Sequence, residues 1–275
     1  MDHQTVLQRW MWAGITLLVV LIINLPIILM VLNSFQTTEQ MIATRDLIPR
    51  MFSLVNYEGL SQTPFFTYLK NSIITSVGST IFSVTAAVLA GYALSRYRNG
   101  LLNGYSVALF AVQMFPIILA LIPLFMLFKP LGLINSPLSV IIIYAVVNLP
   151  FVTWMARSYF DTIPRELEEA ALIDGCGPLT AFVRIVLPLS GPGIAAVSIY
   201  AFLFSYNEFF VANVFLRTTD VMTLPVGIRM FMDQFSTDWG SLMSAATLTM
   251  LPTLILFLFV QKFIQHGAVA GGVKG

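Results

Sequence analysis

The stretch EEAALIDGCGPLTAFVRIVLPLSGPG, Glu168–Gly193, lies between two strongly apolar segments of a chain that carries few charges. Its acids come first, Gly175 and Gly177 follow, and Pro188 and Pro192 stand within the apolar sequence beyond. Acids favour the positive N-terminal end of a helix dipole, and glycine ends a helix because it accepts left-handed backbone angles without strain. The stretch therefore predicts a short helix, a sharp glycine turn, and a second helix joined rigidly to the next apolar segment.

The residues just upstream contain the signals for the start of this first helix. Asp161 or Thr162 can cap it, and Pro164 is tolerated in its first turn. Ile163, Leu167, Ala170, Ala171 and Asp174 recur at helical spacing, and their apolar members give one stripe of modest size. The small side chains would let another polypeptide approach closely. On these residues alone, an ordinary surface helix that only connects two spans is an equally good interpretation.

The composition places the chain in a membrane. Of its 275 residues, 57% are hydrophobic and only 10% are charged, with a mean hydropathy of +0.85, whereas about a quarter of the residues in soluble domains are charged. The net charge of +1 predicts no nucleic-acid partner. The single cysteine, Cys176, excludes an internal disulfide and a Cys-rich metal site, and His3 and His266 lack metal-ligand spacing. We expect no metal.

Apolar runs of helical length predict an all-α integral membrane protein, because backbone groups in lipid must be bonded within the segment. Six spans are expected, at about residues 10–32, 71–95, 101–128, 136–157, 185–212 and 242–263. The first is long enough to cross a core of roughly 30 Å and lacks a cleavage pattern, so it is a retained span and not a secretion signal.

Prolines and small residues inside the spans have separate consequences. Kinks, or breaks that border a cavity, are predicted at Pro26, Pro116, Pro123, Pro150 and Pro252. Close helix contacts are predicted in the second span at Gly78, Ser79, Ser83 and Gly91.

An even number of spans places both termini on one side of the membrane. Basic residues near span ends, among them Arg9, Arg96, Arg98 and Arg157, favour the cytoplasm for that side and for the Glu168–Gly193 loop. The expected organisation is an N-terminal region with the first span (1–35), an external loop (36–70), a transmembrane core (71–265) with a cytoplasmic loop (161–190) and an external loop (213–241), and a flexible cytoplasmic tail (266–275).

A few polar residues inside the spans are candidates for a solute path. Glu208 and Asn207 lie in the fifth span, where a carboxylate is costly and usually faces a cavity or a partner, and Tyr206 offers an aromatic face to a sugar ring. A helix–helix hydrogen bond or a position near the outer interface explains them equally well. Gln113 is similar, with packing as its alternative, whereas Asn148 is expected to be structural.

The loop resembles the EAA loop of permease subunits in binding-protein-dependent ABC importers. The likeness rests on Glu169, Ala170, Ala171, Asp174, Gly175, Ile185, Leu187 and Pro188. The segments NYEGL, LKNSIITS, SYNEFF and GAVAGGVKG resemble the carbohydrate branch, in the type of the smaller maltose permease, so the likeness covers most of the chain. Cys176 stands where a small residue, often Ala, is usual, and the tail reads GGVKG where GAVKG is commoner.

The resemblance implies six transmembrane helices of the type I ABC importer fold with a cytoplasmic coupling helix. The residues that would couple to an ATPase are Leu167, Glu169, Ala170, Ala171, Asp174, Gly175 and Pro188. The implied partners are a second homologous permease, two ATPase subunits, an extracytoplasmic solute-binding protein, a sugar and the lipid bilayer of a bacterial or archaeal cytoplasmic (inner) membrane. The chain itself has no Gly-x-x-x-x-Gly-Lys-Ser/Thr loop, so it would bind no cofactor, and ATP and Mg would be bound by the ATPases.

The expected function is therefore that of a non-catalytic permease subunit for a sugar, a di- or oligosaccharide. An ABC permease for a polyol, glycerol phosphate or another small polar solute is the nearer alternative. An ion-coupled secondary transporter is the more distant one, with Glu208 as its candidate coupling acid. A membrane enzyme would need a catalytic constellation; Glu166, Glu168 and Glu169 are better explained as a solvated helix start.

Overall fold

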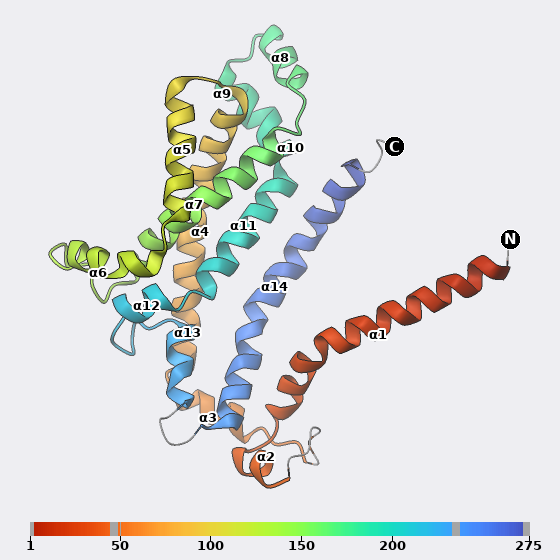
Figure 1. Cartoon of the computed structure of the whole chain (residues 1–275), viewed down its shortest axis with the longest axis vertical. Coiled ribbons are helices and arrows are strands. Elements are labelled where there is room, and N and C mark those ends of the chain that lie inside the picture. Colours follow the sequence, from red (N-terminus) through yellow and green to blue (C-terminus); the bar gives the residue numbers. More distant parts are fainter. Residues whose placement is uncertain (1–2, 45–48, 50, 233–236, 272–275) are drawn as a thin grey trace. The chain divides into compact units, whose positions relative to one another are not determined.

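A computed structural model of the chain describes residues 3–44, 49, 51–232 and 237–271. Most of the described residues are helical, and the extended pairing among them is an isolated bridge between Met232 and Thr237 (Figure 1). Four helices are long and apolar enough to cross a membrane, and two bent helix pairs raise the number to as many as six. The predicted all-α membrane fold is confirmed.

The chain divides into two compact units, and the first contains Met1–Phe65 and Ile228–Met250. Its elements are α1 (His3–Asn33), α2 (Thr38–Thr44), α3 (Val55–Ser61), the 3-10 turn η2 (Ile228–Phe231) and the start of α14 (Trp239–Gly271). The Nδ2 of Asn56 donates to the carbonyls of Ser34 and Gln36, at 2.9 and 2.7 Å. The polar segment after the first span is thus folded around buried side-chain hydrogen bonds.

The second unit contains Phe66–Gly227 and Leu251–Gly275. Its longer elements are most of α4 (Phe65–Arg96), α5 (Gly100–Met114), α6 (Ile117–Phe128), α7 (Pro137–Phe160) and α11 (Gly191–Tyr206). The shorter ones are α8 (Glu166–Ile173), α9 (Pro178–Ala181), the π-helical turn η1 (Phe182–Val186), α10 (Leu187–Leu189), α12 (Phe210–Phe215) and α13 (Leu224–Gly227). Val88, Val152 and Val197 belong to a buried cluster that joins α4, α7 and α11.

Close contacts between α4 and its neighbours confirm the prediction made for the second span. A Cβ at Gly91 would lie 2.9 Å from the backbone nitrogen of Arg157, so only glycine permits this approach of α4 to α7. The Oγ of Ser79 donates to the Oγ of Ser205 on α11 at 2.8 Å. Small residues thus set the spacing of these helices.

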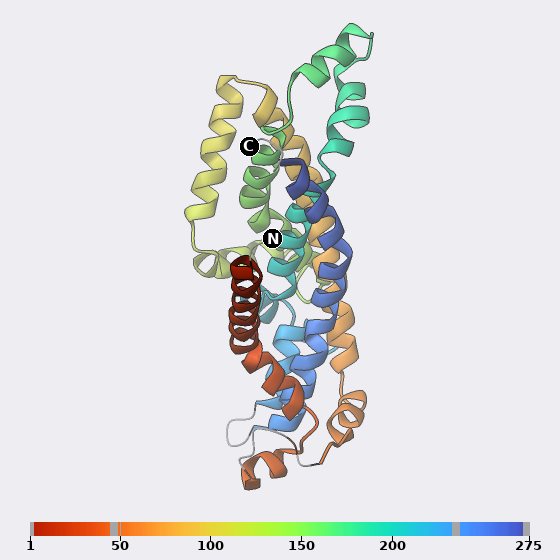
Figure 2. The same ribbon diagram turned by 90° about the vertical axis from the view of Figure 1, so that its right-hand side faces the viewer.

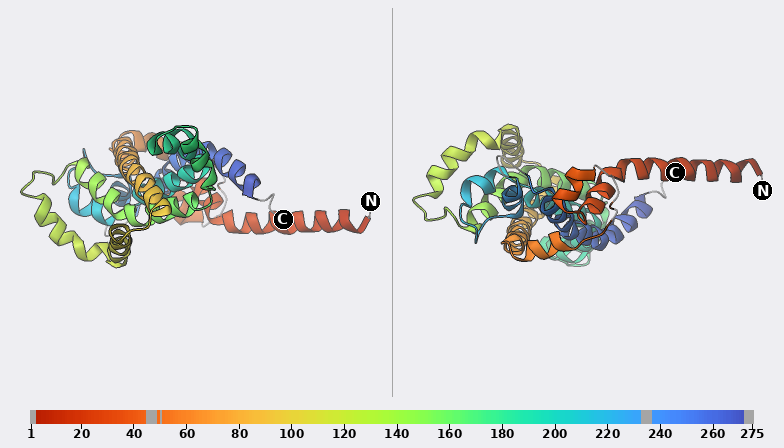
Figure 3. Two further views of the ribbon diagram at one scale, coloured as in Figure 1. Left: turned by 90° about the horizontal axis from the view of Figure 1, so that it is seen from above. Right: turned by 90° about the horizontal axis from the view of Figure 1, so that it is seen from below.

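The third expected span is divided at a proline. The α5 and α6 helices meet at an angle of 100°, and Figure 2 shows α6 turning away below α5. Pro116, which has no backbone N–H to continue α5, is the N-cap of α6. Both views of Figure 3 show α6, in yellow-green, at one side of its unit, where Leu121 and Phe128 pack in a buried cluster with residues of α7 and α12. The break predicted at Pro116 is confirmed, whereas Pro26, Pro123, Pro150 and Pro252 lie inside continuous helices.

The fifth expected span is also divided, so the second helix of the loop does not run straight into the span as expected, and the rigidity of the junction stays a prediction. Pro178–Leu189 and Gly191–Tyr206 meet at 74° around Ser190. Pro188 and Pro192 lack the N–H groups that would bond to carbonyls four residues earlier, which favours the π-helical turn η1 and the bend at Ser190. Farther along, α11 ends at Tyr206 and α12 begins at Phe210.

Two other expected segments can be compared with the structure in part. The segment 213–241, expected as an external loop, contains the end of α12 as well as α13 and η2. The tail expected from residue 266 is helical through Gly271, and residues 272–275 lie outside the described part of the chain. The flexibility of the tail stays a prediction.

Candidate functional site

The helix predicted in the loop is α8, which lies beyond the ends of α4 and α7 (Figure 1). Gly175 has φ +87°, the left-handed conformation expected of it. Its N–H donates to the carbonyl of Leu172 at 3.1 Å, and the N–H of Cys176 donates to that of Ala171 at 3.0 Å. These two bonds form a Schellman motif. Gly177 has a different role, because its φ of −73° and extended ψ place it as the N-cap of α9.

The predicted caps of α8 are wrong. Its N-cap is Arg165, whose side chain does not cap it. Asp161 instead ends α7, and its Oδ1 accepts a hydrogen bond from the Oγ of Ser95 at 2.5 Å. The hydroxyl of Thr162 donates to the carbonyl of Tyr159 at 2.7 Å. Because α7 extends to Phe160, both residues belong to the end of that helix.

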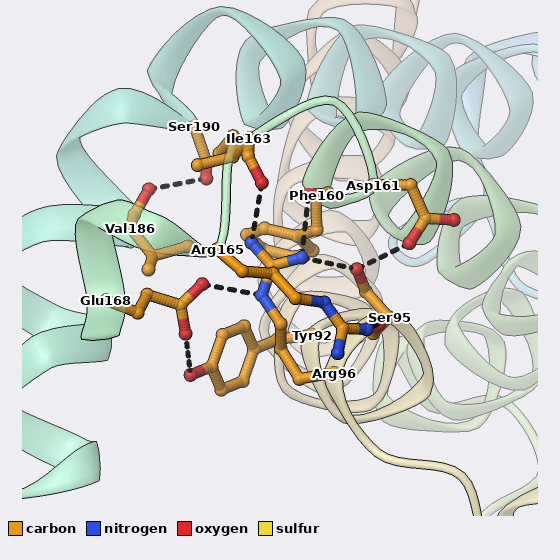
Figure 4. Close-up of polar contacts among 10 residues, drawn as sticks. All are labelled: Tyr92, Ser95, Arg96, Phe160, Asp161, Ile163, Arg165, Glu168, Val186 and Ser190. Carbon is orange, nitrogen blue, oxygen red and sulfur yellow. Dashed lines mark hydrogen bonds and ion pairs between the residues drawn. The ribbon is translucent and has the colours of Figure 1, made fainter.

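The acids in the first turn of α8 have different environments. Glu166 and Glu169 are exposed, as expected for a solvated helix start. Glu168 is buried, and its Oε1 lies 2.5 Å from the Nε of Arg96, with the two side chains 12% and 7% exposed. Its Oε2 accepts a hydrogen bond from the hydroxyl of Tyr92 at 2.7 Å (Figure 4). The interpretation of Glu168 as solvated is therefore wrong.

Arg96 connects this carboxylate to the end of α7. Its Nη1 donates to the carbonyl of Phe160 at 3.0 Å, and its Nη2 donates to that of Ile163 at 3.1 Å (Figure 4). A guanidinium is favoured here because the carbonyls at a helix C-terminus carry partial negative charge. We call Tyr92, Arg96 and Glu168, with the carbonyls of Phe160 and Ile163, the Arg96 clamp. It joins α4, the end of α7 and α8.

Two further contacts support the Arg96 clamp. The Nη2 of Arg165 donates to the carbonyl of Ser95 at 2.7 Å, which attaches the residue before α8 to α4 (Figure 4). The Tyr92 ring packs on Phe160 and Phe182, with ring centroids 5.8 and 4.4 Å apart. The clamp is thus polar on one side and apolar on the other, and water is largely excluded from its ion pair.

Sequence reasoning missed the members of the clamp outside α8. Arg96 was considered only as a charge that sets topology, and Tyr92 was not considered. The available signal was the spacing of four residues between Tyr92 and Arg96, which places both side chains on one face of the second expected span. That span ends on the same side of the membrane as the expected cytoplasmic loop.

The residues predicted to couple to an ATPase are divided between two faces of the loop. Ala171 is buried against the rest of the unit. The others are exposed, namely Leu167, Glu169, Ala170, Asp174, Gly175 and Pro188. Leu172 and Ile173 join them, with 45% and 86% of their surfaces exposed. An exposed apolar patch on a polar loop is typical of a protein-docking surface.

The candidate path residues do not come together. A cavity of about 650 Å³ lies among α5, α6, α7 and α11, and Gln113 lines it. Most of its other lining side chains are apolar, and Asn148 is among the few polar ones. The Nδ2 of Asn148 donates to the Oγ of Ser205 at 3.0 Å, which agrees with the structural role expected of it. Tyr206, Asn207 and Glu208 are not part of the lining.

The break between α11 and α12 accounts for these three residues. Glu208 accepts hydrogen bonds from the backbone N–H groups of Phe210, Val211 and Ala212, at 2.9 to 3.3 Å, so its carboxylate caps α12. Tyr206 is buried and stacks on Phe202. Asn207 is exposed, and its Nδ2 donates to the carbonyl of Leu203 in its own helix.

The chain matches a known family over most of its length. The profile of the family described as "Binding-protein-dependent transport system inner membrane component" matches residues 83–268, a range that includes α8 and the whole Arg96 clamp. The inner membrane ABC transporter permease protein YcjP of Escherichia coli is 33% identical, over 100% of this chain and 99% of that protein. The trehalose/maltose transport system permease protein MalG of Thermococcus litoralis is 33% identical over 99% of both.

A solved structure shares the fold. One chain in the crystal structure of a bacterial ABC transporter involved in the import of the acidic polysaccharide alginate superposes with a TM-score of 0.79. The match covers 95% of this chain and 98% of that chain at 21% sequence identity. At this identity the likeness concerns the fold alone.

Proposed function

Because the chain belongs to the family of inner membrane components of binding-protein-dependent transport systems, we propose that it is the permease subunit of an ATP-driven importer of a di- or oligosaccharide. The family match across residues 83–268 carries the proposal. The trehalose/maltose relative, similar along its full length, supports a sugar as the solute. A polyol or glycerol phosphate remains the alternative within the same transporter class.

The second step of the proposal is that α8 receives motion from a separate ATPase subunit. Its exposed Leu167, Leu172 and Ile173 supply an apolar docking face. The Arg96 clamp on the opposite side would carry a displacement of α8 into α4 and α7. Because the clamp binds α8 to α4 and to the end of α7, α8 would move together with these two helices.

The proposed assembly contains a second homologous permease, two ATPase subunits and an extracytoplasmic solute-binding protein. This chain would hydrolyse nothing, and ATP with Mg would be bound by the ATPases. Both termini and α8 would lie in the cytoplasm, with basic residues at the ends of α4 and α7 supporting this orientation. The segment 213–241 would then face the binding protein.

Along the solute path, we assign different roles to the four candidates. Gln113, which lines the cavity, and Asn207, which is exposed where α11 ends, would contact the solute. Tyr206 and Glu208 would act indirectly, because one is buried and the other caps α12. Glu208 satisfies backbone N–H groups at a helix start, which argues against a role as the proton-coupling acid of a secondary transporter.

The test is uptake by the reconstituted complex. The full chain, its partner permease, the ATPase and the binding protein are placed in proteoliposomes, and radiolabelled maltose and trehalose are supplied with internal ATP. We expect uptake that requires both ATP and the binding protein and that unlabelled glycerol or glycerol phosphate does not inhibit. Uptake driven by a proton or sodium gradient without ATP would refute the proposal.

Crosslinking tests the docking face. Cys176 is replaced by serine, and a single cysteine is introduced at Ile173, which is 86% exposed. We expect a crosslink to the ATPase subunit that a cysteine at Leu101, 83% exposed at the start of α5, does not form. Equal crosslinking from both positions would remove α8 as the docking element.

A further inference from the structure

A polar hollow of about 550 Å³ lies beside the Arg96 clamp, between the ends of α4 and α7 and the segment that leads to α8. Its lining contains the four arginines Arg96, Arg98, Arg157 and Arg165. The acids among the lining residues are Asp161 and Glu166. Because Arg96 is paired with Glu168 in the clamp, three arginines remain against these two acids, and the hollow has an excess of positive charge. Neither the family match nor the expected coupling face assigns a role to it.

Much of the hydrogen-bonding capacity of these arginines is unused. In the part of the chain that the structure describes, Arg98 is exposed and makes no hydrogen bond or ion pair. The Nε of Arg157 is 3.7 Å from Oδ2 of Asp161, which is too long for a hydrogen bond. Arg165 uses Nη2 for the carbonyl of Ser95 (Figure 4). Each guanidinium has five N–H donors, so this hollow presents many more donors than its own acceptors can satisfy.

The position of the hollow suggests where its ligand comes from. It lies where the candidate spans α4 and α7 both end, at Arg96 and Phe160. Helix ends that leave the hydrocarbon core at this point would bring the hollow to the depth of the lipid headgroups. The α5 helix begins two residues after Arg98, at Gly100, and exposes Leu101 and Val107, at 83% and 67%. An apolar surface thus begins next to the arginines, as an acyl chain attached to a headgroup would require.

We propose that this hollow binds the phosphate group of an anionic phospholipid. Arginine suits this ligand because its planar donors match phosphate oxygens in pairs. Basic pockets between the ends of membrane helices are a recognised type of site for anionic headgroups. Arg98 and Arg157 contact the phosphate, Arg165 adds charge beside it, and Arg96 stays in the clamp.

The experiment counts bound lipid on the purified full chain by native mass spectrometry. Wild-type protein in neutral detergent is titrated with phosphatidylglycerol, with phosphatidylcholine of the same acyl chains, and with inorganic phosphate. The variants are Arg98→Gln, which disturbs no contact of the described residues, and the double variant Arg98→Gln/Arg157→Gln. The matched control is Arg184→Gln, because Arg184 is exposed on η1 and does not line the hollow.

We expect phosphatidylglycerol to bind more tightly than phosphatidylcholine, and its affinity to fall about fivefold for each arginine removed from the hollow. The control should bind like the wild type. Equal binding of the two lipids, or unchanged affinity in Arg98→Gln and the double variant, would overturn the proposal. So would inorganic phosphate that binds the wild type as tightly as phosphatidylglycerol, because the ligand would then be a soluble anion.

A second measurement separates lipid from protein. The same count is made on the complex assembled with its ATPase subunits. Retention of phosphatidylglycerol by the wild type and its loss in the double variant support the lipid site. Loss of the lipid on assembly in the wild type would assign the arginines to an acidic segment of the ATPase and overturn the proposal. None of these measurements depends on transport, so a failure of the lipid proposal can be distinguished from a failure of the proposed function.

Discussion

Arg96 and Glu168 are separated by 72 residues in the sequence and form an ion pair of 2.5 Å. One belongs to the last turn of a long membrane helix and the other to the first turn of a short loop helix. Because both side chains are almost fully buried, the pair has a geometry that an exposed ion pair seldom keeps. The loop helix is therefore held in a defined position on the membrane helices.

Glu168→Gln tests the Arg96 clamp. The change leaves a buried guanidinium without its counter-charge, and we expect a loss of about 3 kcal/mol in the free energy of unfolding. The control is Glu169→Gln, which makes the same change at an exposed position and should stay within about 0.5 kcal/mol of the wild type. Thermal and denaturant unfolding of the purified chain in detergent measure both. Equal stability of the two variants would show that the clamp does not hold α8.

Gly175→Ala tests the turn after α8. The left-handed conformation of Gly175, at φ +87°, would cost an alanine about 1 to 2 kcal/mol. Gly177→Ala is the control, since its φ of −73° suits alanine and a Cβ there meets nothing within 4 Å. In reconstituted complexes, Gly175→Ala should lower the amount of solute transported per ATP hydrolysed, and Gly175→Asp should lower it more. Insertion of the chain into the membrane should not change in either variant. The same ratio in the Gly175 and Gly177 variants would contradict this role.

Glu208→Ala tests whether that carboxylate is a helix cap. Removing it leaves the N–H groups of Phe210, Val211 and Ala212 without their acceptor, and we expect a loss of about 1 kcal/mol in unfolding free energy. The half-saturating solute concentration should not change. Asn207→Ala should do the reverse, raising that concentration with little effect on stability. Unchanged stability of Glu208→Ala together with weaker solute binding would make Glu208 a direct solute contact.

Asp238 makes the stability of the first unit dependent on pH. Partial burial raises the pKa of Asp238, but hydrogen bonds from Ser241, Thr38 and the Gly240 backbone outweigh it and lower the pKa below its usual value. The stabilisation is thus fully present above about pH 4, the ordinary pKa of an aspartate, and is lost as the pH falls through the lower value in the folded protein.

Two substitutions at this position separate its charge from its capping role. Asp238→Ala should cost about 1 kcal/mol at pH 7, because it removes the acceptor for the N–H of Ser241 and the hydroxyl of Thr38. Asp238→Asn retains an acceptor and should stay near the wild type at pH 7. Unfolding measured from pH 7 to pH 2 should show a larger loss in the wild type than in Asp238→Asn, because the other carboxylates of the chain are the same in both. A parallel loss in both would place the titrating group elsewhere.

The sequence by itself determined the membrane class, the helical content and the location of the loop helix. The length of the apolar segments is sufficient for the first two predictions, because a backbone in lipid has no alternative to internal hydrogen bonding. Gly175 and Pro116 were also read correctly, since the conformation of glycine and the missing N–H of proline act locally.

Only the tertiary structure decided which face of each element is used. Glu168 and Glu169 are neighbours with the same side chain, yet one pairs with Arg96 and the other is exposed. From the sequence, Glu208 is a candidate path residue, but the helix breaks after Tyr206 and the Glu208 carboxylate caps α12. These outcomes depend on where α4, α7 and α11 end relative to one another within one unit. Local sequence sets the helices, but the partner of a buried charge is set by the packing of residues far apart along the chain.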